Sequence, residues 1–399
     1  MSSASNSRTN PGPDQSNEVL SAPAINRGSR NLGLDLLRLF AILLVIGNHL
    51  RPIPGHHDVL LAGWIRGGWV GVDLFFVLSG FLVAGLLFND FLRNGRVSIA
   101  RFLVRRGFKI YPAFWALIAF SLAAFHSKHQ SVPLRNVLGE LCFVQNYTAH
   151  IWPHTWSLAV EEHFYLSLAF FVFLLVRRPG PEPFSWFPAI FVVMATACLL
   201  LRIQNAARYP QYDYSWDLFP THLRIDSLFF GALLAYAGRF HRLEERIAWF
   251  PTWARLAAGL TLLLPAFIFA RETDRWITVI GFNLFYVGSG LLVLGALRLQ
   301  KTSSRFLRLL GAFGASSYSI YLWHEPINAW FAAGILDSHP GDPGAYWLYL
   351  PVCVFGALFV GYAMAFVIET PVLKLRDRFY PSHARSRPQR GTEANASPS

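Results

Sequence analysis

The sequence has few charged residues and few cysteines for its length. Only 15% of its 399 residues are charged, whereas a soluble domain usually has about 25%. Its three cysteines, Cys142, Cys198 and Cys353, are odd in number and far apart, so neither a disulfide framework nor a zinc cluster is expected. In contrast, 53% of the residues are hydrophobic and 16% are aromatic. The composition therefore predicts a helical membrane protein rather than a soluble enzyme.

Polar segments occur at both ends of the chain. Residues 1–31 are rich in Ser, Asn, Pro and Arg, and residues 379–399 are also polar. Such segments bury too little apolar surface to fold, so we predict disordered cytoplasmic tails on either side of a transmembrane domain over 32–378. No apolar core with a small-residue cleavage site follows a compact basic start. We therefore expect no signal peptide, and the first span to be an uncleaved anchor.

Apolar runs long enough to cross a bilayer predict an all-α, polytopic fold with about ten transmembrane helices. This even number places both termini on one side, which has roughly three times as many Lys and Arg residues as the other. The positive-inside rule makes that side cytoplasmic. The same asymmetry accounts for the net charge of +12, so no nucleic-acid partner is expected. The predicted spans lie near 32–50, 67–88, 108–125, 156–176, 186–201, 222–238, 254–270, 277–297, 309–332 and 346–370.

Two glutamates, Glu161 and Glu162, lie inside the predicted span 156–176. A carboxylate at membrane depth is costly unless it is paired or faces a wet cavity. Ser157 and Tyr165 lie one helical turn before and after Glu161 and share its face. The pattern therefore predicts a polar site inside the membrane.

The first span contains two ionisable residues on one face. Arg38 and His49 are eleven residues apart, which is about three turns and about 16 Å along a helix. One face of this helix would then follow a path through most of the bilayer. The alternative is that Asp35 and Arg38 merely pair at i,i+3 and that His49 is interfacial.

Other spans also contain polar residues that packing alone does not readily explain. The glycine-rich start of the second span is attributed mostly to close helix packing, with Asp73 and Ser79 as functional candidates. At the inner face, a basic cluster could bind anionic lipid or a phosphate-bearing ligand. Charge alone favours lipid binding, or the positive-inside rule, as the explanation of this cluster. The remaining candidates are Arg105, Arg106 and Lys109 in that cluster, Arg224 and Asp226 in the sixth span, and His324 in the ninth.

The longest predicted outer loop, 126–155, contains four histidines. They are His126, His129, His150 and His154. Only the first two have tight ligand spacing, so no metal site is predicted.

Together these stretches resemble the acyltransferase-3 family of integral membrane proteins. The resemblance covers nearly the whole membrane portion, in the family's order. It implies ten transmembrane helices and an O-acyltransferase of the bacterial inner (plasma) membrane that moves an acyl group, often acetyl, from acyl-coenzyme A to a hydroxyl. No bound cofactor is implied.

The acceptors implied are sugars of surface polysaccharide, lipopolysaccharide or peptidoglycan, or macrolide-like glycosides. The matching stretches are 34–38 with His49, 71–81, 105–106 with 110–112, 156–158 with 161–162 and 164–165, 224–226, and 317–324.

The residues and the resemblance together suggest roles. His49 is predicted to be the general base for the acceptor hydroxyl, or a transient acyl carrier, with Glu161 orienting it or stabilising its charge. Lys109 stands where the family has the second arginine of a pair, which keeps the charge but loses the bidentate fork. The residues predicted to bind acyl-coenzyme A are Arg38, Ser79, Arg105, Arg106, Lys109 and Tyr111. Those predicted to bind the acceptor are Asp73, Trp156, Arg224, Asp226 and His324. The last three could instead stabilise the developing oxyanion.

Two other functions fit the same intramembrane polar residues. A proton-coupled transporter also uses buried acids and histidines, although no convincing internal repeat supports it. A non-catalytic glycan flippase could retain the fold. Outer-loop aromatic residues could stack on sugar rings or form an interfacial belt, and the belt is favoured. These aromatic residues are Trp152, Trp156, Tyr209, Tyr212, Tyr214 and Trp216.

Overall fold

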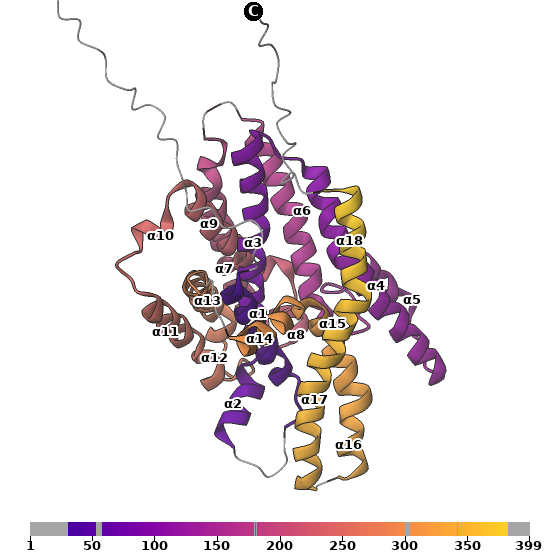
Figure 1. Ribbon diagram of the computed structural model, residues 1–399. Coiled ribbons are helices and arrows are strands. Elements are labelled where there is room, and N and C mark those ends of the chain that lie inside the picture. The colour runs from indigo at the N-terminus through magenta and orange to yellow at the C-terminus, as the bar shows by residue number, and fades with distance from the viewer. Residues whose placement is uncertain are drawn as a thin grey trace, which may run out of the picture. The chain divides into compact units, whose positions relative to one another are not determined.

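The computed structural model describes residues 31–52, 58–178, 180, 182–299, 304–340 and 342–381, and within them all regular structure is helical (Figure 1). The predicted all-α class is therefore confirmed. The predicted tails lie almost entirely outside the described residues. The longer helices are α1 Leu32–Asn48, α2 Val59–Gly67, α3 Val70–Asn94, α4 Ile99–Ser127, α5 Leu134–Leu141, α6 Trp156–Val176, α7 Phe187–Arg208, α9 Ile225–Phe240, α11 Thr252–Leu263, α13 Phe282–Ala296, α14 Arg305–Ala315, α15 Ser317–Ile327, α17 Pro343–Met364 and α18 Thr370–Phe379.

Short helical segments connect or extend these helices. Three of them are π-helical: η5 precedes α13, η6 follows α15, and η7 joins α17 to α18. The short segments are η2 Pro153–Thr155, η3 Pro183–Trp186, α8 Tyr214–Asp217, η4 Thr221–Leu223, α10 Leu243–Arg246, α12 Pro265–Ile268, η5 Ile277–Gly281, η6 Asn328–Ala332, α16 Ala333–Ser338 and η7 Ala365–Glu369.

Six helical stretches among the described residues are long and apolar enough to cross a membrane. The protein is therefore a multi-pass membrane protein. Two further helices are shorter, α1 with 17 residues and α9 with 16, and both pack against α3. The count of ten spans and the cytoplasmic location of the termini stay predictions. The six stretches are Val70–Asn94, Ile99–Ser127, Pro153–Val176, Pro183–Arg208, Ile277–Ala296 and Gly344–Phe379.

The predicted span 309–332 is wrong as a single helix. Helix α14 ends at Ala315, and Ser316 leaves helical geometry with φ −97° and ψ 9° before α15 begins. Gly314, Ser316 and Ser317 at this break have weaker helix propensity than alanine. They also permit close contact, because a Cβ on Gly314 would lie 1.7 Å from the backbone oxygen of Asp35 in α1. The break directs the polar α15 toward α1.

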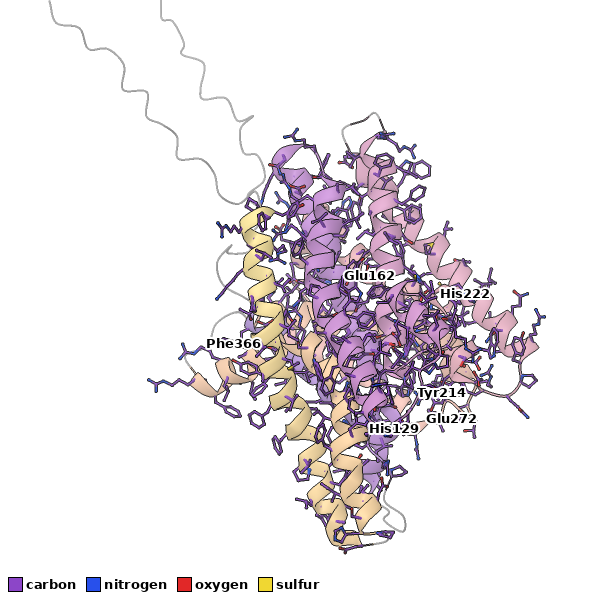
Figure 2. The ribbon with its side chains drawn as sticks, turned by 90° about the vertical axis from the view of Figure 1, so that its right-hand side faces the viewer. His129, Glu162, Tyr214, His222, Glu272 and Phe366 are labelled. Carbon is purple, nitrogen blue, oxygen red and sulfur yellow. The ribbon has the colours of Figure 1, made fainter. Side chains whose placement is uncertain are left out.

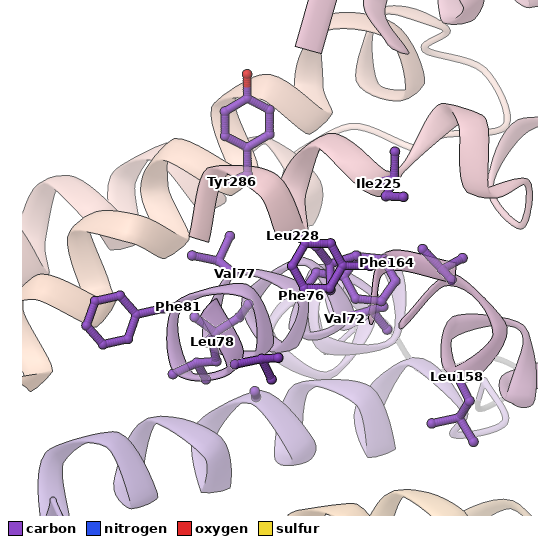
Figure 3. Packing of buried hydrophobic residues seen from close by; sticks show 14 of the residues in the cluster. Val72, Phe76, Val77, Leu78, Phe81, Leu158, Phe164, Ile225, Leu228 and Tyr286 are labelled. Atoms are coloured by element: carbon purple, nitrogen blue, oxygen red, sulfur yellow. The ribbon is translucent and has the colours of Figure 1, made fainter. Parts of the chain in front are cut away.

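Helix α3 lies at the centre of the core and packs most extensively against α9. A Cβ on Gly80 would lie 1.9 Å from the Leu228 backbone oxygen, and one on Gly231 would lie 2.1 Å from that of Val77. Small residues let membrane helices approach this closely, so the packing role predicted for the second span is confirmed. Figure 3 shows Phe76 of α3 and Phe164 of α6 gathering beside Leu228 of α9. This packing fixes α3, α6 and α9 around the polar residues described next.

Candidate active site

His49 lies at the C-terminal end of α1, where the backbone has just left helical geometry. Its Nδ1 is 2.8 Å from the Val45 carbonyl oxygen, so Nδ1 carries a hydrogen and donates it there. Its Nε2 lies 3.3 Å from Oε1 of Glu325 in α15. The two side chains are 23% and 16% exposed, so another molecule can reach this pair.

Two more imidazoles complete a histidine cluster of His49, His154 and His324. The His324 ring centroid lies 4.9 Å from each of the other two. Nδ1 of His324 is 2.6 Å from the Tyr321 carbonyl oxygen, and its Nε2 is 3.3 Å from Nδ1 of His49. Both ring nitrogens of the buried His154 lack a hydrogen-bond partner among the described residues. Thus α1, η2 and α15 each contribute one histidine.

The predicted pairing of Glu161 with His49 is wrong, and Glu325 occupies that place. Oε2 of Glu161 accepts hydrogen bonds from Tyr165, at 2.5 Å, and from Ser79, at 3.2 Å. The reason is the orientation of α6, which turns Glu161 toward α3 rather than toward the end of α1. Glu325 directly follows the candidate His324, which could have marked it as a candidate too, although nothing in the sequence pairs it with His49.

A cavity of about 360 Å³ lies between α1, α3, α4, α6 and α15. We call it the cationic cavity because three basic side chains, Arg38, Arg106 and Lys109, line it. Ser79 and Glu161 line it too. Of the six residues predicted to bind the donor, the structure therefore brings together four, namely the three cations and Ser79. The shared face predicted for Ser157, Glu161 and Tyr165 is confirmed, because all three line this cavity.

The histidine cluster is not part of the lining of the cationic cavity. Tyr321 connects the two: it lines the cavity, and its ring centroid is 5.4 Å from that of His324. Its hydroxyl donates to the His154 carbonyl oxygen at 2.5 Å. The predicted path from Arg38 to His49 along α1 is therefore interrupted by α15, which places Tyr321 and His324 between its two ends.

The three cations of the cationic cavity differ in their partners. Arg38 pairs with Asp35 at 2.7 Å, so the predicted i,i+3 pair is confirmed. Lys109 pairs with Glu369. Arg106 makes no ion pair with a described carboxylate, and its guanidinium lies 5.9 Å from the Tyr165 ring centroid. Arg106 is therefore the cation best suited to an incoming anion.

Arg105 and Tyr111, also predicted to bind the donor, do not line the cationic cavity. Arg105 pairs with Asp377 of α18 at 3.1 Å, because α18 packs beside α4. Tyr111 donates to Oε2 of Glu162, in the N-terminal half of α6, at 3.1 Å (Glu162 is labelled in Figure 2). Both side chains therefore join helices of the bundle, and the prediction that they contact the donor finds no support in this geometry.

Four of the five predicted acceptor residues lie in the core instead of lining a cavity. Asp73 and Arg224 form a fully buried ion pair at 2.7 Å, and Asp226 pairs with the buried Arg202 of α7. Trp156 is also buried and stacks on Phe219. Buried charges need such pairing, which explains why these groups turn toward one another. Of the predicted acceptor residues, only His324 joins the histidine cluster.

Three ligand atoms, one each from His49, His324 and Glu325, lie within 4.8 Å of one another. Two imidazoles and a carboxylate are a donor set that suits a divalent cation. None of these three residues is one of the four outer-loop histidines. One of those four, His154, lies beside this set, with its ring centroid 4.9 Å from that of His324.

A buried glutamate outside the membrane-spanning helices fixes the segment that leads to His154. Glu140 of α5 accepts from the Ile151 backbone N–H at 2.8 Å and from the Thr155 hydroxyl at 2.9 Å. These bonds favour the carboxylate, but burial dominates and raises the pKa of Glu140 to about 7 from an ordinary value of 4.5. Between about pH 4.5 and pH 7, the folded protein therefore keeps a proton on Glu140 that the unfolded chain loses.

This raised pKa predicts lower stability at higher pH. The contribution of Glu140 is fully present below pH 4.5, where both states are protonated, and is lost as the pH rises to about 7. Relative to Glu140→Gln, the wild type should lose about 2–3 kcal/mol of unfolding free energy across this window. Unfolding in detergent at several pH values measures the difference. The matched control is Glu272→Gln, because Glu272 is about half exposed. Parallel pH profiles for wild type and Glu140→Gln would contradict the prediction.

The fold and the site define a class of protein: a multi-pass membrane protein in which a histidine–glutamate pair lies near a cavity lined by basic side chains. Residues 31–366 match the profile of the acyltransferase-3 family, described as an acyltransferase domain, and the chain belongs to this family.

Named relatives agree with the family assignment. The O-acetyltransferase OatA of Staphylococcus aureus is 27% identical over 372 residues, which cover 86% of this chain and 57% of that protein. The peptidoglycan O-acetyltransferase OatA of Listeria monocytogenes is 26% identical over 373 residues, covering 86% of this chain and 55% of that protein. The chain therefore spans little more than half the length of these relatives. No solved structure matches the chain significantly.

Proposed function

We propose that this protein is a membrane O-acyltransferase that moves an acyl group, most simply acetyl, from acyl-coenzyme A to a hydroxyl of a glycan. The observation that carries the proposal is the His49–Glu325 pair, which Tyr321 and His324 separate from a cavity lined by three basic side chains. Membership of the acyltransferase-3 family supports it. The relatives' names, O-acetyltransferase and peptidoglycan O-acetyltransferase, support acetyl as the group and a glycan as the acceptor.

The cationic cavity is the proposed site for the donor. Guanidinium groups bind phosphate through charge-assisted, often bidentate hydrogen bonds. Arg106 has no carboxylate partner among the described residues, so a phosphate would not need to displace one. Lys109 and Arg38 already have partners and would add attraction at longer range. The thioester would then extend along Ser157 and Tyr321 toward the histidine cluster.

The proposed chemical step uses His49 as the general base. Nε2 takes the proton of the acceptor hydroxyl while the hydroxyl oxygen attacks the thioester carbonyl carbon. The C–O bond forms, the C–S bond breaks, and the imidazolium returns the proton to the departing sulfur. An ester and the free thiol of coenzyme A are the products. Glu325, 3.3 Å from Nε2, stabilises the imidazolium while it exists.

The test is incubation of the purified protein with labelled acetyl-coenzyme A and a glycan acceptor, measuring free thiol and labelled glycan together. Both products should appear at equal rates. Arg106→Ala should raise the KM for acetyl-coenzyme A by about 10- to 100-fold, because a charge-assisted hydrogen bond contributes about 1.5–3 kcal/mol. The kcat should change little if Arg106 binds donor and transition state equally.

Arg96→Ala is the matched control, because Arg96 is exposed in the turn between α3 and α4. It removes the same charge without touching the cationic cavity, so its KM should stay near the wild-type value. Equal increases in KM for both variants would show a general electrostatic effect and overturn the role of Arg106. Proton-coupled uptake of a solute without thiol release would overturn the enzyme proposal in favour of a transporter.

A further inference from the structure

A second cavity, of about 300 Å³, opens where α7 ends and the loops before α6 and α9 meet. We call it the aromatic groove, and its lining includes Tyr147, Gln204, Tyr209, Trp216 and His222. It shares no lining residue with the cationic cavity. His222 and Tyr214, which mark this region, are labelled in Figure 2. The groove is thus a separate site that the proposed donor binding and chemistry do not use.

Two parallel ring pairs belong to this groove. Tyr209 stacks on Trp216 with centroids 6.0 Å apart and planes 20° apart, and Tyr147 stacks on His222 at 5.8 Å and 13°. Trp216 is 59% exposed and Tyr147 is 51% exposed, so ring faces remain uncovered. An interfacial belt spreads aromatic residues around the perimeter of a protein, whereas these four rings line one cavity. The structure therefore disfavours the belt interpretation for Tyr209 and Trp216.

The polar groups of the groove suit a neutral, hydroxyl-rich ligand. No described Asp or Glu lines it, and Arg208 is its one charged arginine or lysine. Gln204 lies exposed on α7. Asn146 is 2% exposed and lines the groove, and its Nδ2 donates to the Thr221 hydroxyl at 2.8 Å. Its Oδ1 is buried and has no hydrogen-bond partner among the described residues, so the wall of the groove holds an unused acceptor.

The groove is connected by packing to the wall of the cationic cavity. Phe219 lines the groove and stacks on Trp156, with centroids 5.3 Å apart. Ser157, which follows Trp156 in the sequence, lines the cationic cavity, and its hydroxyl is 2.6 Å from that of Tyr321. A ligand in the groove would therefore lie on the far side of α6's first turn from the donor.

We propose that the aromatic groove binds sugar rings of the acceptor glycan. The apolar C–H face of a sugar would lie on the exposed ring of Trp216, and its hydroxyls would bond to Gln204 and Asn146. This combination of apolar faces with a few placed polar groups is typical of small-molecule sites. The inference rests on the proposed acyl transfer and names the place where the acceptor is held.

The test measures binding of tetrasaccharides of glucose, mannose and N-acetylglucosamine to the full chain in lipid nanodiscs by saturation-transfer NMR. At least one should bind the wild type. Trp216→Ala should weaken its binding about tenfold or more, because truncating a central aromatic anchor has large effects. Gln204→Ala should weaken it less. Trp249→Ala is the matched control, because Trp249 is 80% exposed and lies outside the groove.

Kinetics provide an independent readout. Trp216→Ala should raise the KM for the glycan acceptor by the same factor as the dissociation constant, with kcat and the KM for acetyl-coenzyme A unchanged. A second set of tetrasaccharides, each attached to a membrane lipid, distinguishes the source. Tighter binding of these forms would identify a lipid-linked glycan, and equal binding would identify free polymer. Either result supports the groove.

The failures of the two proposals are distinguishable. If no tetrasaccharide binds in either form, or if Trp216→Ala and Trp249→Ala bind alike, the groove proposal is overturned even where acyl transfer continues. If binding is lost only in the groove variants but no acceptor releases thiol from acetyl-coenzyme A, acyl transfer is overturned and the saccharide site stands.

Discussion

Replacing His49 by alanine is expected to lower the kcat of acyl transfer by about 10²- to 10⁴-fold, the range that a general acid–base group contributes. Nε2 of His49 faces Glu325 at 3.3 Å, and the His49 side chain is partly exposed, so an acceptor hydroxyl can approach the pair. Without the imidazole, the hydroxyl would attack while still protonated. The KM for acetyl-coenzyme A should stay within a few-fold, because His49 does not line the cationic cavity. Single-turnover release of thiol measures the chemical step.

The choice of carboxylate partner separates the structure from the sequence-based prediction. Glu325→Gln keeps the shape but removes the negative charge beside His49, so it should lower kcat more than Glu161→Gln does. His126→Ala is the matched control for His49→Ala, because His126 is exposed at the end of α4. This variant should transfer acyl groups at the wild-type rate. A larger loss of kcat in Glu161→Gln than in Glu325→Gln, with both proteins inserted equally, would favour Glu161 as the partner of His49. A His49→Ala protein with unchanged kcat would refute the base assignment altogether.

The largest effect on stability is expected at the buried pair of Asp73 and Arg224. Asp73→Leu should lower the free energy of unfolding by about 3–5 kcal/mol, because it leaves the Arg224 guanidinium buried without its partner. Both side chains are 0% exposed, so water cannot replace the lost bond. Arg224 also lies 3.7 Å from the Phe282 ring centroid, which does not compensate for a missing carboxylate. Reversible unfolding in mixed micelles measures the change.

A double variant tests whether the unpaired charge is the cause. Asp73→Leu combined with Arg224→Met removes both charges and should recover much of the stability lost in Asp73→Leu alone. Asp337→Ala breaks the exposed pair of Arg51 and Asp337 and should cost about 0–1 kcal/mol. If the double variant were no more stable than the single one, Asp73 would act through a contact other than this ion pair.

Several features of the site were predictable because they depend on local spacing. Ser157, Glu161 and Tyr165 recur at intervals of four residues, so one helical face had to present all three, and they line the cationic cavity together. Asp35 and Arg38 pair at i,i+3 for the same reason. The glycines of α3 had no side chain to bury and were correctly assigned to close packing.

Other features depended on contacts between distant segments. Glu325 and His49 are separated by most of the chain, and no spacing rule could have paired them. Arg224 and Asp226 looked like acceptor residues because intramembrane charges are costly, yet the same cost is met by pairing with Asp73 and Arg202. The aromatic residues Tyr209 and Trp216 had two interpretations in the sequence, and only their stacking on one groove distinguishes them.

The sequence by itself determined that this is an all-helical, multi-pass membrane protein with ionisable groups inside it, because apolar run length and helical period are properties of each segment alone. Tertiary structure decided which of those groups meet. A helix can rotate about its axis without changing its hydrophobic length, so hydrophobic length does not fix which side chains meet. In the folded protein, Glu161 of α6 contacts Ser79, and Glu325 of α15 contacts His49. Helix packing therefore decides which intramembrane charges pair in the core and which meet at His49, the proposed site of the chemistry.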